Sequence, residues 1–148
     1  MQTRQQKDSL RALEDVQAIR DSNEDDLKKT YARAVYRFPF LVRQNGLQQT
    51  LGFYEGKAKP PSASGAEENA SLGNAEEEFL KHIAQVLGIQ RSDLISTISG
   101  VDVEKYMYLS RRCLEVALWY RRFTASVLGV DITGNPTEEQ VTAEGGEE

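Results

Sequence analysis

An Asn-Gly pair in the first half of the chain separates two helical patterns, and this break constrains the fold more than any other feature. Apolar residues recur at helical spacing from Leu27 to Phe38, and a new apolar face begins at Leu47 directly after the pair. Asn45 and Gly46 are residue types that tolerate a positive φ, so we expect them to close the first helix with a left-handed cap. Residues 39–54 are therefore predicted to form a helix–helix corner, and they contain no catalytic motif.

Apolar periodicity and capping residues predict helices along most of the remaining chain, with no competing β-alternation. The expected helices cover residues 3–20, then 24–44 with a kink at Pro39, 47–54, 75–87, 92–99 and 103–128. On the first of them we expect the apolar flank to be Leu10, Leu13, Val16 and Ile19. The predicted fold class is all-α: a compact single-domain helical bundle of about five to six helices, with a long C-terminal helix.

Two segments are not expected to belong to the core. Residues 56–72 are rich in Pro, Ser and Gly, and we expect a mobile loop there. Residues 130–148 hold six carboxylates and no base, so we expect an acidic tail without a fixed structure. Because the whole chain has a formal charge of −5, the predicted bundle over residues 1–129 carries a net charge of only +1.

The sequence offers little for catalysis or cofactor binding. The single cysteine, Cys113, falls on an apolar helix face and is expected to be a buried thiol. The single histidine, His82, could pair with Glu78 one turn earlier, although we expect a partly exposed histidine with a helix neighbour. Three consecutive helical residues, Glu76 to Glu78, point about 100° apart and cannot converge on a metal ion. We therefore expect no enzyme, no cofactor and no metal.

No apolar run approaches the length of a membrane span, and no secretory leader opens the chain. The sequence on its own therefore predicts a cytoplasmic protein without a membrane contact.

Binding is better supported, because basic and aromatic residues are predicted to lie outside the core on two helices. At about 100° per residue they project away from the expected apolar stripes. The candidates on the second helix are Lys29, Arg33, Tyr36 and Arg37, and those on the last helix are Tyr108, Arg111, Arg112, Trp119 and Arg122. Such faces can bind an RNA backbone and stack its bases. They can also form protein interfaces, in which Trp, Tyr and Arg are enriched.

Three interpretations of these faces stay open at this level: a solvated surface, a protein interface and an RNA-binding surface. A further possibility is that another helix of the bundle covers the face between Arg111 and Trp119. A helical adaptor that binds only protein is the alternative function, and strong salt dependence of nucleic-acid binding would separate the two.

A family resemblance favours binding. The sequence has Lys29-Thr30-Tyr31, then a Pro-containing helix, then Asn45-Gly46-Leu47 followed by Leu51-Gly52-Phe53, and near its end Trp119 to Phe123 with an Arg-Phe pair. In these features it resembles the small α-helical subunit of type III-B CRISPR effector complexes, the fifth subunit of the Cmr module. The resemblance covers most of residues 1–129, and it departs from the family pattern over Tyr106 to Leu114.

This resemblance implies a non-catalytic structural subunit in antiviral defence. It would stack in a filament with further copies of itself, beside the crRNA-binding backbone subunit, and would help to hold crRNA and target RNA. The resemblance does not say which of the two faces meets RNA.

Overall fold

The computed structural model describes residues 1–22, 24–61 and 72–130, and every regular element in these ranges is helical. The elements are α1 (Arg4–Arg20), α2 (Asp25–Asn45), α3 (Leu47–Lys57), α4 (Ala75–Leu87), the 3-10 turn η1 (Arg91–Asp93), α5 (Leu94–Gly100), α6 (Val103–Phe123) and the π-helical turn η2 (Thr124–Leu128). This confirms the predicted all-α fold with a long C-terminal helix.

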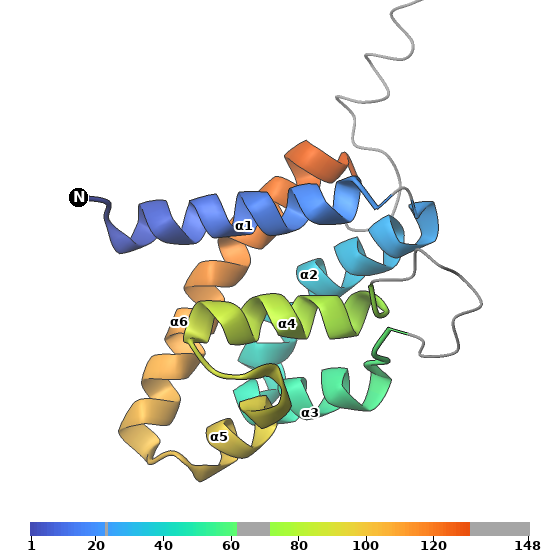
Figure 1. Cartoon of the computed structure of the whole chain (residues 1–148). Helices are drawn as coiled ribbons and strands as arrows, with labels where there is room; N and C mark the ends of the chain where they lie inside the picture. The colour runs from blue at the N-terminus through green and yellow to red at the C-terminus, as the bar shows by residue number, and fades with distance from the viewer. Residues whose placement is uncertain (23, 62–71, 131–148) are drawn as a thin grey trace, which may run out of the picture.

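The helices form one bundle around α4, which contacts α1, α2, α3 and α6. Figure 1 shows α1 lying across α6 and alongside η2, while α3 and α5 lie at the opposite end of the molecule. Helix α2 contacts α3, α4 and α6 through its buried residues, and its exposed positions face solvent. The outer side of α2 is therefore a surface that no other described helix covers.

An aromatic cluster fills the centre of the bundle. The ring of Phe79 on α4 lies 5.0 Å from the ring of Phe38 and 6.1 Å from that of Tyr31, both on α2, in edge-to-face geometry. Tyr54 of α3 and Tyr120 of α6 pack on the same ring at 5.9 and 6.0 Å. Edge-to-face pairs bring the positive ring edge to the negative ring face, so this cluster holds four helices together beyond simple burial.

The corner between α2 and α3 turns at Gly46, as predicted, but its geometry differs from the expected left-handed cap. Gly46 has φ 88° and ψ 162°, an extended conformation with positive φ that is essentially restricted to glycine. Gly46 ends α2 and also begins α3, and it has no side chain to cap the new helix. The hydroxyl of Tyr106 on α6 instead accepts a hydrogen bond of 3.0 Å from the backbone N–H of Gln48.

Most predicted boundaries are confirmed by their caps. Asn74 and Asp102 accept hydrogen bonds from backbone N–H groups in the first turns of α4 and α6, and Gly88 closes α4 in the left-handed conformation. Helix α2 continues through Pro39 to Asn45, in agreement with a helix that does not end at the proline. Two details differ from the expectation: α3 extends to Lys57, and the last turn of the long helix is a π-helix.

The predicted apolar flank of α1 was wrong at Leu10, which is 46% exposed, whereas Asp8 and Ala12 are buried.

Residues 62–71, the larger part of the expected mobile loop, lie outside the described residues, and so do residues 131–148 of the expected tail.

Candidate functional site

The outer side of α2 carries a row of cations. Lys29, Arg33 and Arg37 are all exposed, and none of them forms an ion pair with another residue that the structure describes. The row exists because α2 is amphipathic. Most of its apolar residues face α4 and α6, and the helical repeat therefore places the polar residues between them on the opposite side. The placement of these three side chains follows the helical projection of the sequence.

A cleft between α2 and α3 extends this row. It encloses about 130 Å³, and its walls include Arg33, Arg37, Phe53, Lys57 and Glu76. Phe53 is 48% exposed, and the ammonium group of Lys57 lies 4.6 Å from the centre of its ring. The cleft thus offers three cations and one half-exposed aromatic ring against a single carboxylate. Neither Lys57 nor Phe53 was a candidate from the sequence, because both belong to the short helix α3, whose position relative to α2 the sequence does not reveal.

Tyr36 does not belong to the exposed face, in contrast to the sequence-based prediction. It is 8% exposed, and its hydroxyl donates a hydrogen bond of 2.9 Å to the carbonyl of Val130, just beyond η2. The guanidinium of Arg121 on α6 lies 5.6 Å from the centre of the Tyr36 ring. The end of the described chain therefore covers Tyr36, and Arg121 of α6 places an exposed cation beside the α2 row.

We call the resulting surface the basic band. It consists of Lys29, Arg33 and Arg37 on α2, Lys57 on α3 and Arg121 on α6. The band spans three helices that lie far apart in the sequence.

The second candidate surface, on α6, is divided. Tyr108 is 42% exposed with Lys105 stacked over its ring at 5.2 Å, and Arg111 is exposed close by in the sequence. Toward the end of α6, the Trp119 ring stacks on Phe123 at 6.0 Å, and the exposed Arg122 lies 5.4 Å from the indole.

Arg112 does not belong to this exposed surface, which corrects its predicted placement. Its side chain is only 11% exposed, and its guanidinium donates two hydrogen bonds to Asp8 of α1, one of them 2.7 Å long. Helix α1 contacts α6 through this pair, so the possibility that another helix covers the face applies to Arg112. The role of Arg112 is to join α1 to α6.

A hollow of about 360 Å³ lies beside Trp119. Its lining includes Arg122 and the exposed Leu118, but also the carboxylates of Asp8 and Glu115. Asp8 is paired with Arg112 and Glu115 with Arg4, so among the described residues Arg122 is the one cation of this lining without an ion-pair partner. This end of α6 therefore suits a mixed apolar and polar partner better than an RNA backbone.

His82 lies in a buried polar network and not at the surface, in contrast to the expectation of a partly exposed side chain. The Tyr31 hydroxyl is 2.7 Å from Nδ1 of His82, and the Asp15 carboxylate is 4.0 Å from Nε2. The Tyr120 hydroxyl donates a hydrogen bond of 2.6 Å to Asp15, and its ring stacks on the imidazole. Burial lowers the pKa of His82 to about 4 and raises the pKa of Asp15. The network thus links α1, α2, α4 and α6 through a neutral imidazole.

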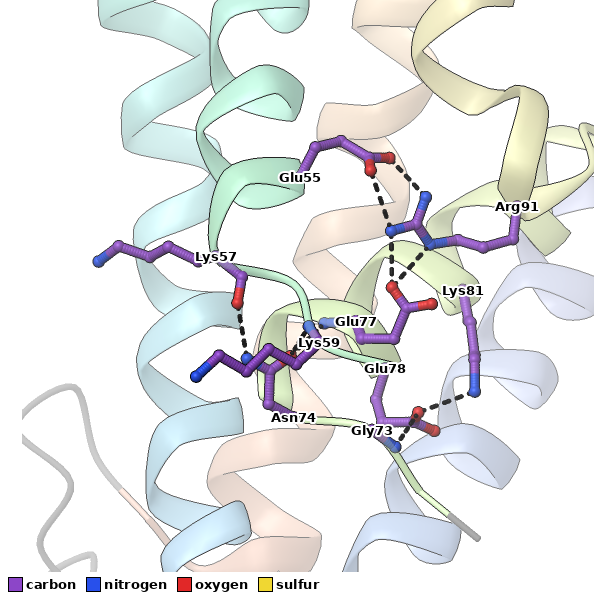
Figure 2. A network of polar contacts seen from close by, with 9 residues as sticks. All are labelled: Glu55, Lys57, Lys59, Gly73, Asn74, Glu77, Glu78, Lys81 and Arg91. Atoms are coloured by element: carbon purple, nitrogen blue, oxygen red, sulfur yellow. Dashed lines mark hydrogen bonds and ion pairs between the residues drawn. The ribbon is translucent and has the colours of Figure 1, made fainter. Parts of the chain in front are cut away.

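The three glutamates at the start of α4 have different surroundings, as their directions around the helix require. Glu77 and Glu55 of α3 both accept hydrogen bonds from Arg91, which ties α3 and α4 to η1 (Figure 2). Glu78 accepts from the backbone N–H of Gly73 and from Lys81. The described residues contain no group of three acidic, histidine or cysteine side chains placed to hold a metal ion.

Asn74 closes the base of the segment between α3 and α4. Its side chain accepts a hydrogen bond from Lys59 N–H and donates one to the carbonyl of Lys57, in addition to capping α4 (Figure 2).

Cys113 is buried, as predicted, and burial raises the pKa of its thiol to about 12. Within the described ranges, no helix has the length and apolar character needed to span a membrane.

Comparison with known proteins gives concordant results. Residues 4–127 match the model of a family described as CRISPR-associated protein (Cas_Cmr5). The chain is 30% identical over 129 residues to a curated protein of Thermus thermophilus named "CRISPR system Cmr subunit Cmr5", and the match covers 86% of this chain and 98% of that relative. Its fold is similar, with a TM-score of 0.66 and 28% identity, to the crystal structure of a CRISPR-associated Cmr5 family protein from the same organism, over 86% of this chain and 99% of the other.

Proposed function

The chain belongs to the Cmr5 family of CRISPR-associated proteins, and from this premise we propose that it is a non-catalytic structural subunit of a Cmr effector complex of type III-B. In that role it stacks with further copies of itself beside the crRNA-binding backbone subunit, and it helps to hold crRNA and target RNA during cytoplasmic antiviral defence. The observation that carries the proposal is the family match along almost the whole described bundle, from residue 4 to residue 127.

We assign the RNA contact to the basic band. Its three α2 cations have no ion-pair partner among the described residues, so a phosphate backbone would not have to displace an existing carboxylate. Phe53 in the adjoining cleft is 48% exposed, and its ring with the Lys57 ammonium group over it offers an aromatic and cationic contact for a base. Contacts of this kind hold an RNA strand with little regard to its sequence, as a subunit that serves many guides requires.

We assign protein contacts to the end of α6. Trp119 and Leu118 supply apolar area there, and Arg122 is the one cation in the lining of the hollow among the described residues. The two surfaces share only α6, where Arg121 belongs to the basic band and Leu118 and Trp119 belong to the hollow. An adaptor that binds only protein would need the α6 surface and would leave the basic band solvated.

The experiment compares two sets of substitutions in the assembled complex. The band variant carries Lys29→Gln, Arg33→Gln and Arg37→Gln, and the matched α6 variant carries Arg111→Gln and Arg122→Gln. Arg112 is left intact because it pairs with Asp8. Target-RNA affinity is measured as a function of salt concentration, and far-UV circular dichroism checks that helicity is unchanged.

We expect the band variant to weaken RNA binding and to reduce the slope of log K against log salt by about 0.7 for each lost phosphate contact. The α6 variant should keep the wild-type slope. If the band variant keeps the wild-type affinity and slope while Trp119→Ala prevents incorporation into the complex, the protein is an adaptor and the RNA assignment is wrong.

A further inference from the structure

We propose that residues 131–148 dock on the basic band of the same chain, where they occupy the cations that RNA would contact. The docking stands on the charges and the geometry of this chain alone. The competition with RNA rests, in addition, on the function proposed above.

The described chain ends on α2, the helix that carries three of the five cations of the band. The carbonyl of Val130 accepts a hydrogen bond from Tyr36, and Val130 packs with Ala32 and Tyr36 in a small cluster on α2. Arg33 and Arg37 lie on α2 within one turn of Tyr36, and Arg121 lies over its ring. Val130, the last described residue, therefore contacts the tyrosine that carries the Arg121 cation over its ring.

The charges of the two partners are complementary. Residues 131–148 contain six carboxylates and no lysine or arginine. The five cations of the band are opposed locally by Glu76 in the cleft and by Asp26 one turn before Thr30 on α2. The end of α6 is a poorer receptor, because Arg122 is the one cation in the lining of its hollow among the described residues. Of the two candidate surfaces, the basic band thus suits the acidic segment better.

The length of the segment does not limit this contact. Lys29 lies seven residues before Tyr36 on α2, which corresponds to roughly 10 Å along the helix axis. Eighteen residues span up to roughly 60 Å when fully extended. Because the segment is covalently attached at Val130, its effective concentration at the band is on the order of millimolar, so even a weak ionic interaction can populate the docked state.

The test uses a spin label on the full-length chain. Thr142→Cys introduces an accessible thiol, and the native Cys113 is buried and stays unlabelled. A nitroxide attached at position 142 should broaden the NMR signals of α2 amides between Lys29 and Arg37 at about 50 mM salt. The broadening should disappear at about 0.5 M salt, where ionic attraction acts over only a few ångströms.

The matched control carries the same label on a segment whose six acids are replaced by amides: Asp131→Asn, Glu138→Gln, Glu139→Gln, Glu144→Gln, Glu147→Gln and Glu148→Gln. Docking predicts no broadening of α2 in this variant. Unbroadened α2 signals in the acidic chain at low salt, or equal broadening in the amide variant, would overturn the proposal.

A second arm adds a twelve-nucleotide oligouridylate to the labelled chain. RNA should abolish the α2 broadening, and the amide variant should bind the oligonucleotide at least about threefold tighter, as expected if two thirds of the acidic chains are docked. If the segment docks but RNA neither binds nor displaces it, the competition is wrong and the RNA assignment of the band fails with it. If RNA binds while α2 is never broadened by the label, the docking is wrong and the proposed function stands.

Discussion

Gly46 holds a backbone conformation that residues with a side chain rarely adopt, and a Cβ atom there would lie 3.3 Å from the Tyr106 hydroxyl. We therefore expect Gly46→Ala to lower the free energy of unfolding by about 1–3 kcal/mol. Gly52→Ala is the matched control, because Gly52 lies inside α3 with nothing within 4 Å of its added Cβ, and it should stabilise by about 0.5–1 kcal/mol. Urea unfolding of the two variants measures both effects. Equal stabilities would contradict a strained corner.

His82 makes stability depend on pH through burial. Its pKa is about 4 in the folded chain, against an ordinary value of 6.5, so the unfolded chain binds more protons between these two values. The contribution of His82 to the free energy of unfolding is fully present above pH 6.5. It is lost as the pH falls to about 4, a change of about 3 kcal/mol. Asp15 acts in the opposite direction, because its raised pKa favours the folded state as the pH falls.

The effect of His82 is isolated by comparison with His82→Gln. Urea unfolding at several pH values between about 4 and 7 should show a smaller loss of stability in the variant than in the wild type, whatever its stability at neutral pH. Parallel curves for the two proteins would mean that His82 does not cause the pH dependence. The other charged groups that face the imidazole, Asp15, Glu78 and Lys81, are present in both proteins.

At the scale of the helices, Arg91 adds an ionic link between α3 and α4. It binds Glu55 of α3 and Glu77 of α4, whose side chains are 28% and 10% exposed (Figure 2). Because this ion pair is partly buried, we expect Arg91→Gln to cost about 1–2 kcal/mol of unfolding free energy. Chemical denaturation provides the measurement.

The matched control is Arg4→Gln, which removes an ion pair between α1 and α6 whose side chains are 56% and 54% exposed. It should cost less than about 0.5 kcal/mol, since water already screens these charges. Similar costs for the two substitutions would show that burial of the Arg91 pair does not matter.

At the scale of the whole molecule, the bundle should be stable without its acidic segment. Removal of residues 132–148 leaves Val130 and its hydrogen bond with Tyr36 in place. The thermal midpoint should change by less than about 2 °C, because docking by exposed charges contributes little to folding. Differential scanning calorimetry of the two chains provides the measurement. A drop of many degrees would mean that the segment packs apolar side chains on the bundle.

Local sequence determined the helices and their ends. Asn74, Asp102 and Gly88 are caps because a side-chain oxygen or a missing Cβ satisfies a helix end without help from distant residues. The same applies to the position of the corner at Gly46, although the sequence did not predict its ψ of 162°. Apolar periodicity likewise identified the buried stripe of α2 that ends at Phe38.

Tertiary structure decided which of the remaining residues are free to bind. A helical projection describes the directions of side chains around one helix, and it carries no information about what lies beyond them. Arg112 and Tyr36 both project outward, yet α1 crosses the first and Val130 covers the second. Conversely, Lys57 and Arg121 join the basic band only because α3 and α6 both pack against α2. Burial depends on neighbours that are distant in sequence, so the helices follow from the chain itself and the candidate site from their packing.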